Sequence, residues 1–311
     1  MKAARFHRFG ETLHVEEVGE PAPADGEVLV RVEFASVNPQ DIWLTRGTVA
    51  GGRQPLPFVP GSEAAVEAEG RLWIVSGGDY GIVRDGFYAE RVAISRDHLV
   101  PLPEGADPAQ ASALRVAGIT AWRLVDDVTR VAAGDHVLVL GASGGVGSLL
   151  VQLCRARGAT VWGQTGSQDR ARSITELGAD RVIVARAEDL VSATAGLQPT
   201  VVFDPLGGLF TRAAVELLQP HGRLGMFGAS AGPEITLPVT GVYRKGLSIL
   251  GYSGSVEPPE RSSRALAEVL GELAAGRLRI PIGDILPLDS APEAHRRILD
   301  RRAGGKILLQ P

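Results

Sequence analysis

The chain has 311 residues, of which 44% are hydrophobic and 22% are charged, and its formal net charge is -4. This composition is that of a globular protein, and the length suits one long domain or two ordinary ones. The slight acidity leaves no basic surface for nucleic acid or for an anionic membrane. The single cysteine, Cys154, excludes an internal disulfide and a cysteine-rich zinc site, so we expect a cytoplasmic protein.

The first third of the chain is predicted to be rich in β-strands. Apolar residues alternate at Val28, Val30, Val32 and Phe34, which is the period of a half-buried strand over 27–37. Further short apolar runs, separated by glycine-rich turns, lie at 64–68, 72–75 and 89–94.

From about Val116 onward, apolar strands alternate with helical segments. The candidate strands are 137–140, 160–164, 181–184, 201–204, 223–227 and 247–251. The candidate helices are 146–157, 169–177 and 209–218. Such alternation predicts a parallel sheet covered on both faces, and six strands suit a doubly wound dinucleotide-binding domain.

The C-terminal tail changes character again. Residues 262–275 and 291–300 are predicted to be helical, and 306–309 is predicted to be a last strand. Because an isolated strand needs a sheet to join, we expect the tail to return to the first domain. The predicted domains are therefore 1–115 completed by 257–311, and 116–256.

The strongest local signal is the glycine turn Gly141-Ala142-Ser143-Gly144-Gly145-Val146-Gly147, which follows an apolar strand and precedes an apolar helix. A diphosphate needs close backbone approach and the free amides of a helix start. Gly144 and Gly147 match the second and third glycines of the dinucleotide fingerprint, although alanine stands at the first. These glycines also favour strand, turn and helix over a membrane span in the uncharged stretch 137–154.

The end of the second predicted strand bears on the choice of cofactor. An NAD site usually places a carboxylate there to hold the ribose 2′-hydroxyl, and residues 160–167 contain none. Ser167 can donate a hydrogen bond to a 2′-phosphate, and Arg170 can pair with it. We therefore predict NADPH as the cofactor. The alternative is that Arg170 is only a solvated charge.

Several segments together resemble the medium-chain dehydrogenase/reductase superfamily, specifically its zinc-independent quinone oxidoreductase branch. Each fragment is short, but their order and spacing are specific. They are 36–41 (SVNPQD, similar to VNPxD), 58–65 (FVPGSEAA, similar to PGxEAAG), 118–122 (GITAW, similar to GLTAY), 176–180 (ELGAD, similar to LGAD) and 305–309 (GKILL, similar to GKxVL).

This resemblance implies an α/β fold that combines a Rossmann doubly wound parallel sheet with a GroES-like β-rich catalytic domain. It also implies a homodimer, an expectation taken from many relatives. The cofactor-binding residues that it implies are Thr120 at the nicotinamide, Ser143, Gly144, Gly145 and Val146 at the diphosphate, Gly166, Ser167, Arg170 and Arg302 at the 2′-phosphate, and Gly228, Ala229 and Ser230 beside the nicotinamide.

The sequence departs from the zinc-dependent members of the superfamily. Those members have cysteine in the segment around Asn38 and histidine where Ser62 stands. Asn38 and Ser62 are poor zinc ligands and Glu63 alone is insufficient, so we expect no metal. Many quinone and enoyl reductases also have a tyrosine near position 49. The stretch 48–50 is Thr-Val-Ala here, which counts against an enoyl thioester reductase.

Without a metal, the substrate must already accept hydride, as a quinone or an activated enone does. The incipient oxyanion then needs hydrogen-bond donors and a proton. Asn38 is the candidate donor, and Asp41 and Trp43 are candidate site residues. A turn-capping carboxylate is the alternative for Asp41, and core packing is the alternative for Trp43.

The predicted function is hydride transfer from NADPH to a quinone. Two alternatives stay open. One is an NADPH-dependent enone, 2-alkenal or enoyl reductase, and the other is a non-catalytic NADPH-binding stress or sensor protein.

Overall fold

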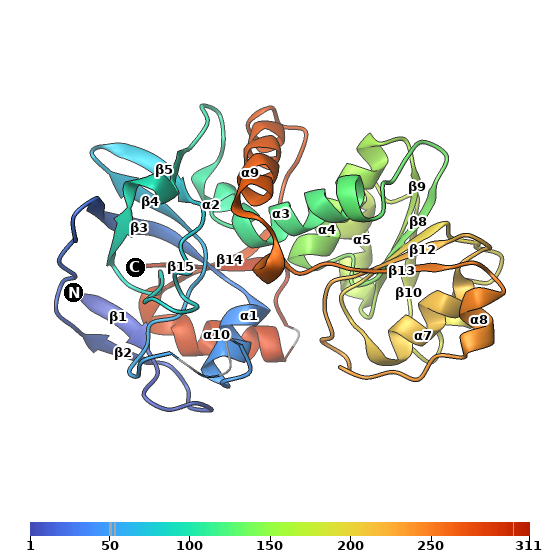
Figure 1. Cartoon of the computed structure of the whole chain (residues 1–311), viewed down its shortest axis with the longest axis horizontal. Coiled ribbons are helices and arrows are strands. Elements are labelled where there is room, and N and C mark those ends of the chain that lie inside the picture. The colour runs from blue at the N-terminus through green and yellow to red at the C-terminus, as the bar shows by residue number, and fades with distance from the viewer. Residues whose placement is uncertain (50–51, 53, 301) are drawn as a thin grey trace. The chain divides into compact units, whose positions relative to one another are not determined.

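The computed structural model describes residues 1–49, 52, 54–300 and 302–311. Ala50, the last residue of the 48–50 stretch, therefore lies outside the described residues. The chain folds into two compact units, the first formed by Met1–Val116 with Pro259–Pro311 and the second by Ala117–Pro258 (Figure 1).

The first unit is built around a largely antiparallel sheet with β3 at its centre, and it also contains a separate two-stranded antiparallel sheet. Its strands are β1 (Lys2–Arg5), β2 (His14–Glu17), β3 (Glu27–Val37), β4 (Ala64–Ala68), β5 (Arg71–Val75), β6 (Arg91–Ser95), β7 (Leu99–Pro101), β14 (Ile282–Pro287) and β15 (Lys306–Gln310). Its α-helices are α1 (Pro39–Thr45), α2 (Pro108–Ala111), α9 (Pro259–Ala274) and α10 (Ala291–Leu299), and α3 (Leu114–Arg123) begins in it.

Strand β3 spans the predicted residues, and its alternating pattern buries Val30 and Val32, which are each 1% exposed. The sheet order is β14-β15-β3-β4-β5-β7, and β6 pairs with β3. The last strand of the tail, β15, pairs antiparallel with β3 in the sheet of the first unit. The neighbouring strand β14 has no counterpart among the predicted strands.

The second unit contains a parallel sheet with the strand order β10-β9-β8-β11-β12-β13. Its strands are β8 (His136–Val139), β9 (Thr160–Thr165), β10 (Arg181–Val184), β11 (Val201–Asp204), β12 (Arg223–Met226) and β13 (Ser248–Gly251). Its α-helices are the remainder of α3 followed by α4 (Gly145–Ala156), α5 (Ala171–Glu176), α6 (Leu190–Ala193), α7 (Gly208–Leu217) and α8 (Val239–Tyr243), with a π-helical turn at Leu124–Val128.

The strand order reverses direction between β8 and β11. Because crossovers between parallel strands are right-handed, the helices before and after this reversal cover opposite faces of the sheet. Figure 1 shows α4 and α5 on one side of the strands and α7 and α8 on the other. The predicted α/β class, a doubly wound sheet with a GroES-like unit, is confirmed. Ligands of such sheets bind beyond the carboxyl ends of the strands at the reversal.

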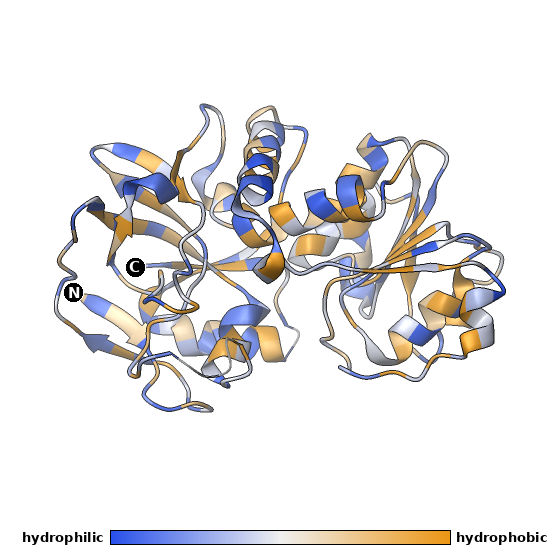
Figure 2. Cartoon of the chain, in the orientation of Figure 1, coloured by the Kyte–Doolittle hydropathy of each residue, from blue (hydrophilic) through white to orange (hydrophobic). Residues whose placement is uncertain are grey.

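Hydrophobic residues concentrate in the parallel strands of the second unit, as Figure 2 shows. Strand β11 is buried along its whole length, as expected for a strand covered on both faces. The uncharged stretch 137–154 forms β8, the glycine turn and α4, as predicted. Among the described residues, no helix is both long enough and apolar enough to cross a membrane.

Some predicted boundaries are wrong by a few residues. The strand predicted at 89–94 runs from Arg91 to Ser95, because Ala89 forms an isolated bridge with Ala3 instead. The helix predicted at 169–177 begins as a 3₁₀ turn at Gln168–Arg170 and becomes α5 only at Ala171.

Helix α4 begins in close contact with the glycine turn. A Cβ added to Gly147 would lie 2.4 Å from the carbonyl oxygen of Gly141 and 2.8 Å from the Cα of Ala142. Both obstacles are backbone atoms, so alanine at this position requires the helix and the turn to separate. Gly141 itself has a φ of +61°, in the left-handed region that favours glycine.

We predict that Gly147→Ala lowers the free energy of unfolding by about 1–3 kcal/mol, as overpacking does in closely packed sites. Gly271→Ala is the matched control, because Gly271 lies within α9 and a Cβ added there meets nothing within 4 Å. The control should stabilise the chain by up to about 1 kcal/mol. Chemical denaturation of both variants measures the two effects, and equal effects would contradict the packing at the turn.

Candidate functional site

The glycine turn presents the start of α4 without a side-chain cap. Gly144 is the N-cap residue, with φ -78° and ψ 170°, and it carries no side chain that could accept from the helix. The first amides of a helix have no acceptor within the helix, so those following Gly144 are available to a ligand. Gly144 is exposed, and Ser143, Gly145 and Val146 are half-buried. The structure thus brings these four predicted residues together at one helix start, where an anion is favoured.

Gln164 holds this turn in place, although it was not among the predicted site residues. Its side-chain oxygen accepts from the amide of Gly141 at 2.9 Å, and its backbone oxygen accepts from the amide of Ala142 at 2.9 Å. Its side-chain nitrogen donates to the carbonyl of Ala185 at 2.7 Å. Gln164 is 2% exposed. A polar residue in an otherwise apolar buried strand is the signal that could have identified it.

The residues predicted at the 2′-phosphate follow β9. Gly166 is exposed, Ser167 and Arg170 are half-buried, and the amide of Ser167 donates to the Thr165 hydroxyl at 3.3 Å. Arg170 ends the 3₁₀ turn that precedes α5. The same turn carries Asp169, which is exposed. This turn therefore carries one cation and one anion.

The other predicted cofactor residues lie on several elements. Thr120 is half-buried on α3. Gly228, Ala229 and Ser230 follow the carboxyl end of β12, and the Ser230 hydroxyl donates to the Pro205 carbonyl at 3.3 Å. Arg302, in contrast, belongs to the first unit, where it is exposed and its amide donates to Arg297 at 2.8 Å.

In the first unit, a buried polar network surrounds Asn38. The Lys306 ammonium donates to the Asn38 side-chain oxygen at 2.7 Å and to Glu63 Oε1 at 3.0 Å. The Asn38 amide nitrogen donates to the same Glu63 oxygen at 2.9 Å. All three side chains are at most 7% exposed. The Asn38 amide is therefore already hydrogen-bonded on both sides, which favours a positioning role for it.

Glu63 also connects this network to the start of α3. Its second carboxylate oxygen accepts from the amide of Val116 at 2.7 Å. Beside it, the Arg115 guanidinium donates to the carbonyl of Ser62 at 2.7 Å. Every oxygen of the Glu63 carboxylate thus has a donor, as a buried charge requires.

Asp41 lies at the edge of the same network. Its Oδ2 accepts from the amide of Asn38 at 2.8 Å and from the Tyr88 hydroxyl at 3.0 Å, which is the capping arrangement considered from the sequence. Its Oδ1 is buried and has no partner among the described residues. Burial, together with the nearby Glu63 carboxylate, raises the pKa of Asp41 to about 6. Trp43, on the same helix, is 39% exposed, which contradicts plain core packing.

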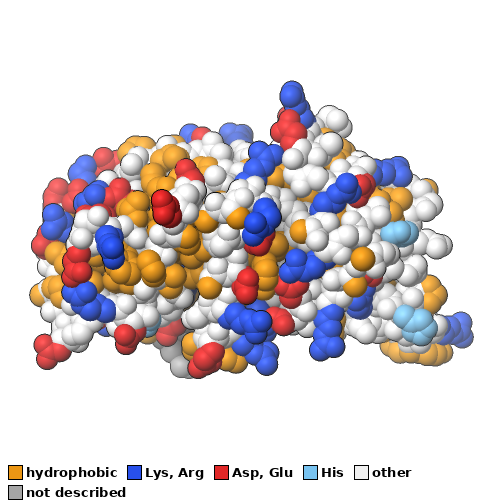
Figure 3. Space-filling view, turned by 90° about the horizontal axis from the view of Figure 1, so that it is seen from above, with side chains coloured by type: hydrophobic (Ala, Val, Ile, Leu, Met, Phe, Trp, Pro, Cys, Tyr) orange, Lys and Arg blue, Asp and Glu red, His pale blue; other side chains and the backbone are white. Residues whose placement is uncertain are grey.

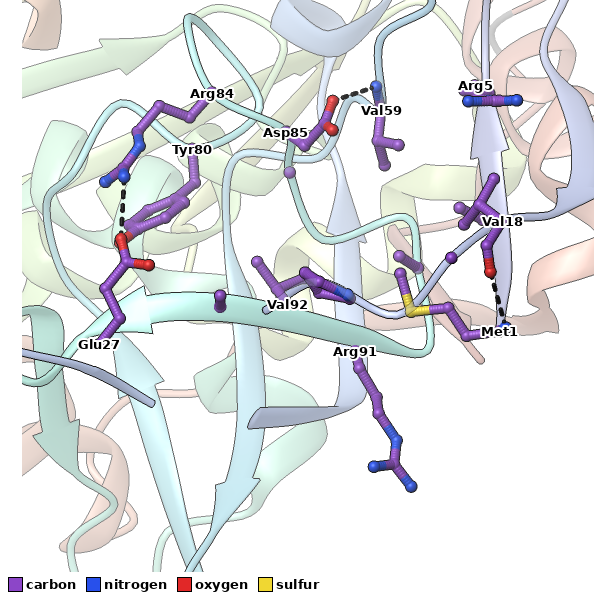
Figure 4. A pocket seen from close by; sticks show the side chains of 16 residues that line it. Met1, Arg5, Val18, Glu27, Val59, Tyr80, Arg84, Asp85, Arg91 and Val92 are labelled. Atoms are coloured by element: carbon purple, nitrogen blue, oxygen red, sulfur yellow. Dashed lines mark hydrogen bonds and ion pairs between the residues drawn. The ribbon is translucent and has the colours of Figure 1, made fainter. Parts of the chain in front are cut away.

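A hollow of about 480 Å³ in the first unit contains none of the predicted site residues (Figure 4). Charged side chains that line it already have partners within the unit. Arg84 pairs with Glu27 at 2.8 Å, and Asp85 accepts from the amide of Val59 at 2.9 Å. On the molecular face seen in Figure 3, positive and negative side chains are intermixed.

Two family models match the chain. The alcohol dehydrogenase GroES-like domain matches residues 24–71, and the zinc-binding dehydrogenase model matches residues 145–271. A quinone oxidoreductase of Sus scrofa is 31% identical over 99% of this chain and 97% of its own length. That of Mus musculus is 32% identical over 99% and 98%. The chain belongs to the quinone oxidoreductase family of the medium-chain dehydrogenase/reductase superfamily.

Solved structures agree with this assignment. The quinone oxidoreductase of Thermus thermophilus, also solved with NADPH, has a TM-score of 0.88 and 30% identity, and each chain is covered completely. An NAD-dependent alcohol dehydrogenase likewise has a TM-score of 0.88 and 30% identity, with each chain covered completely. These similarities support an oxidoreductase that uses a nicotinamide cofactor.

The buried ion pair predicts a large effect of Lys306→Met. Removing the ammonium leaves Glu63 buried without its cation, so we expect a loss of about 3–5 kcal/mol in the free energy of unfolding. Lys2→Met is the control, because Lys2 pairs with Asp289 on the surface, where the two side chains are 45% and 60% exposed. Solvent screens such an exposed pair, so its loss should change the free energy of unfolding far less than the loss of the buried one. Similar losses in denaturant titrations of the two variants would argue against a buried pair at Lys306.

The raised pKa of Asp41 predicts a pH dependence of stability. An unfolded aspartate ionises near pH 4, whereas Asp41 in the folded chain resists ionisation up to about pH 6. The contribution of Asp41 is therefore complete below pH 4 and decreases as the pH rises through 6, by about 2–3 kcal/mol in total. The difference in unfolding free energy between the wild type and Asp41→Asn should change by this amount between pH 4 and 7. A difference that is constant with pH would contradict the shift.

Proposed function

We propose that this chain is a zinc-independent NADPH:quinone oxidoreductase that transfers hydride from NADPH to a quinone. The observation that carries the proposal is the uncapped start of α4 at the glycine turn, in a chain whose full length is similar to quinone oxidoreductases. The glycine turn supports the binding of a dinucleotide, and the similar proteins support a quinone as the hydride acceptor.

NADPH is favoured by the residues that follow β9. Ser167 and Arg170 supply a hydroxyl and a cation, and β9 ends in Thr165 without a carboxylate for a ribose hydroxyl. Because Asp169 shares the turn with Arg170, the preference depends on which of these two charges faces the ribose. Comparing the cofactor preference of the variants Arg170→Ala and Asp169→Ala shows which of the two charges determines it.

The absence of zinc is supported by the chemistry of the buried network. Asn38, Ser62 and Glu63 hold the positions at which the family's metal-binding residues are expected. Here the Lys306 ammonium already lies 2.7 Å from the Asn38 oxygen and 3.0 Å from Glu63 Oε1. A zinc ion would have to displace this cation and would gain only one strong ligand, Glu63. These residues do not fit a catalytic zinc.

The residues proposed to act in catalysis are Asn38 and Asp41. A bound reduced nicotinamide supplies the hydride, and the quinone already accepts it, so the protein has to orient the reactants and provide a proton. The Oδ1 of Asp41 has no partner in the part of the chain that the structure describes, and the pKa of Asp41 is raised to about 6, which lets it hold or release a proton close to neutral pH. Asn38 positions Asp41 through the bond from its backbone amide.

The proposal is tested by steady-state kinetics with NADPH and NADH against a panel of quinones and 2-alkenals. We expect kcat/KM to be highest with NADPH and a quinone. Arg170→Ala should lower kcat/KM for NADPH about tenfold and leave NADH nearly unchanged, since a charge-assisted contact contributes about 1.5 kcal/mol or more. Arg172→Ala is the matched control, because Arg172 is 90% exposed and pairs with Glu176.

The other outcomes identify the alternatives. Faster turnover of 2-alkenals than of quinones would replace the quinone by an activated alkene. Tight binding of NADPH without oxidation by any acceptor would indicate a stress or sensor protein. Stoichiometric zinc in the active protein would overturn the metal-free site.

We further propose a cytoplasmic homodimer. The buried, unpaired Cys154 suits a reducing compartment. Strand β13 is the last strand of the parallel sheet, and its Ile249 is 40% exposed, so this edge can accept a second strand. Light scattering in solution measures the expected doubling of the mass.

A further inference from the structure

The second unit contains a buried tyrosine hydroxyl that forms no hydrogen bond of ordinary geometry among the described residues. Tyr252 directly follows β13, and its side-chain oxygen is inaccessible to solvent and has no hydrogen-bond partner among the described residues. A buried polar group without a partner is costly, and a native structure that keeps one commonly reserves it for a ligand or a water.

The position of Tyr252 at the end of a sheet strand indicates which ligand could bind to its hydroxyl. Strands β12 and β13 are parallel, and Met226 pairs with Gly251 at their carboxyl ends. The amide of Tyr252 continues this ladder by donating to the carbonyl of Met226 at 2.9 Å. Tyr252 therefore lies at the same edge of the sheet as Gly228, which follows β12. This is the edge at which doubly wound sheets bind nucleotides.

The residues near the hydroxyl also indicate the nucleotide site. The Thr120 side chain lies near enough to the phenol to oppose the rise of its pKa, but the pair does not reach ordinary hydrogen-bond geometry. Thr120 is the residue expected at the nicotinamide. Glu257 and Arg123 also lie near enough to influence the phenol. At Gly254, an added Cβ would lie 3.8 Å from the hydroxyl oxygen, so no side chain from that position competes for it.

The segment that carries Tyr252 is fixed to α3 by an ion pair. The Arg123 guanidinium contacts Glu257 at 2.8 Å and 3.1 Å, and the two side chains are only 8% and 15% exposed. Burial raises the pKa of Tyr252 to about 12, so the phenol stays neutral and can donate a hydrogen bond throughout the physiological range. The hydroxyl is thus a preorganised neutral donor.

We propose that the Tyr252 hydroxyl donates a hydrogen bond to the nicotinamide end of the cofactor, beside Thr120, and so fixes the orientation of the ring. The acceptor group is the carboxamide oxygen, the hydrogen-bond acceptor that the nicotinamide ring carries. This inference rests on the proposed function and adds to it a contact residue for the reactive half of the nucleotide.

The test compares wild-type protein with Tyr252→Phe, which removes only the hydroxyl. Calorimetric titrations use NADPH against 2′-phospho-ADP-ribose, and NADH against ADP-ribose, since each second compound lacks the nicotinamide. We expect Tyr252→Phe to weaken the binding of the complete cofactor about fivefold, the effect of one neutral hydrogen bond, and to leave the ADP-ribose compounds unchanged. Tyr243→Phe is the control, because Tyr243 is 61% exposed on α8 of the same unit.

Thermal unfolding without ligand provides a second readout. Removing an unpartnered buried hydroxyl should leave the melting temperature unchanged or raise it, whereas removing an internally bonded one lowers it. Unchanged cofactor binding, or equal weakening of cofactor and ADP-ribose compound, overturns the role of Tyr252, as does a lower melting temperature. If neither ADP-ribose compound binds the wild type, the proposed function itself fails.

Discussion

The second unit depends on a backbone contact between Gly147 and Gly141. With no Cβ at Gly147, α4 can begin directly against the turn that ends β8, and its first amides face outward without a cap. A single added methyl group would separate helix and turn. Gln164 completes the arrangement from the next strand by bonding the turn at Gly141. The arrangement of the proposed anion site is therefore a consequence of close packing.

The first unit contains charged side chains that are buried inside its β-rich core. Glu63 and Lys306 neutralise each other, and Asn38 bonds to both. Beside this cluster, Asp41 has a raised pKa and one carboxylate oxygen without a partner among the described residues. The hydrogen-bonded cluster of Asn38, Glu63 and Lys306 thus lies beside one carboxyl group, that of Asp41, which can exchange a proton. This difference supports the proposal that Asp41 transfers the proton and that Asn38 positions Asp41.

The features that could be predicted from the sequence are local ones. Strand β11 matches the predicted residues, because a buried parallel strand is a short, continuous apolar run. Strand β10 also matches its predicted residues, although it lies at the edge of the sheet and two of its four residues are exposed. Strand β14 escaped prediction because Gly283 and Asp284 interrupt its apolar residues, and it depends on pairing with β15. The bond between Glu63 and Lys306 joins residues 243 positions apart, so no window of sequence contains it. The unpartnered hydroxyl of Tyr252 likewise depends on contacts between distant segments.

The most direct test of the central claim observes the amides at the start of α4. In the 15N-labelled chain, titration with ADP-ribose and with 2′-phospho-ADP-ribose should shift the amide resonances of Gly145 and Val146 saturably, since both compounds carry the diphosphate. If these amides bind the diphosphate, their shifts should be among the largest in the spectrum. Saturable binding that leaves both amides unchanged, or no binding of either compound, would contradict it.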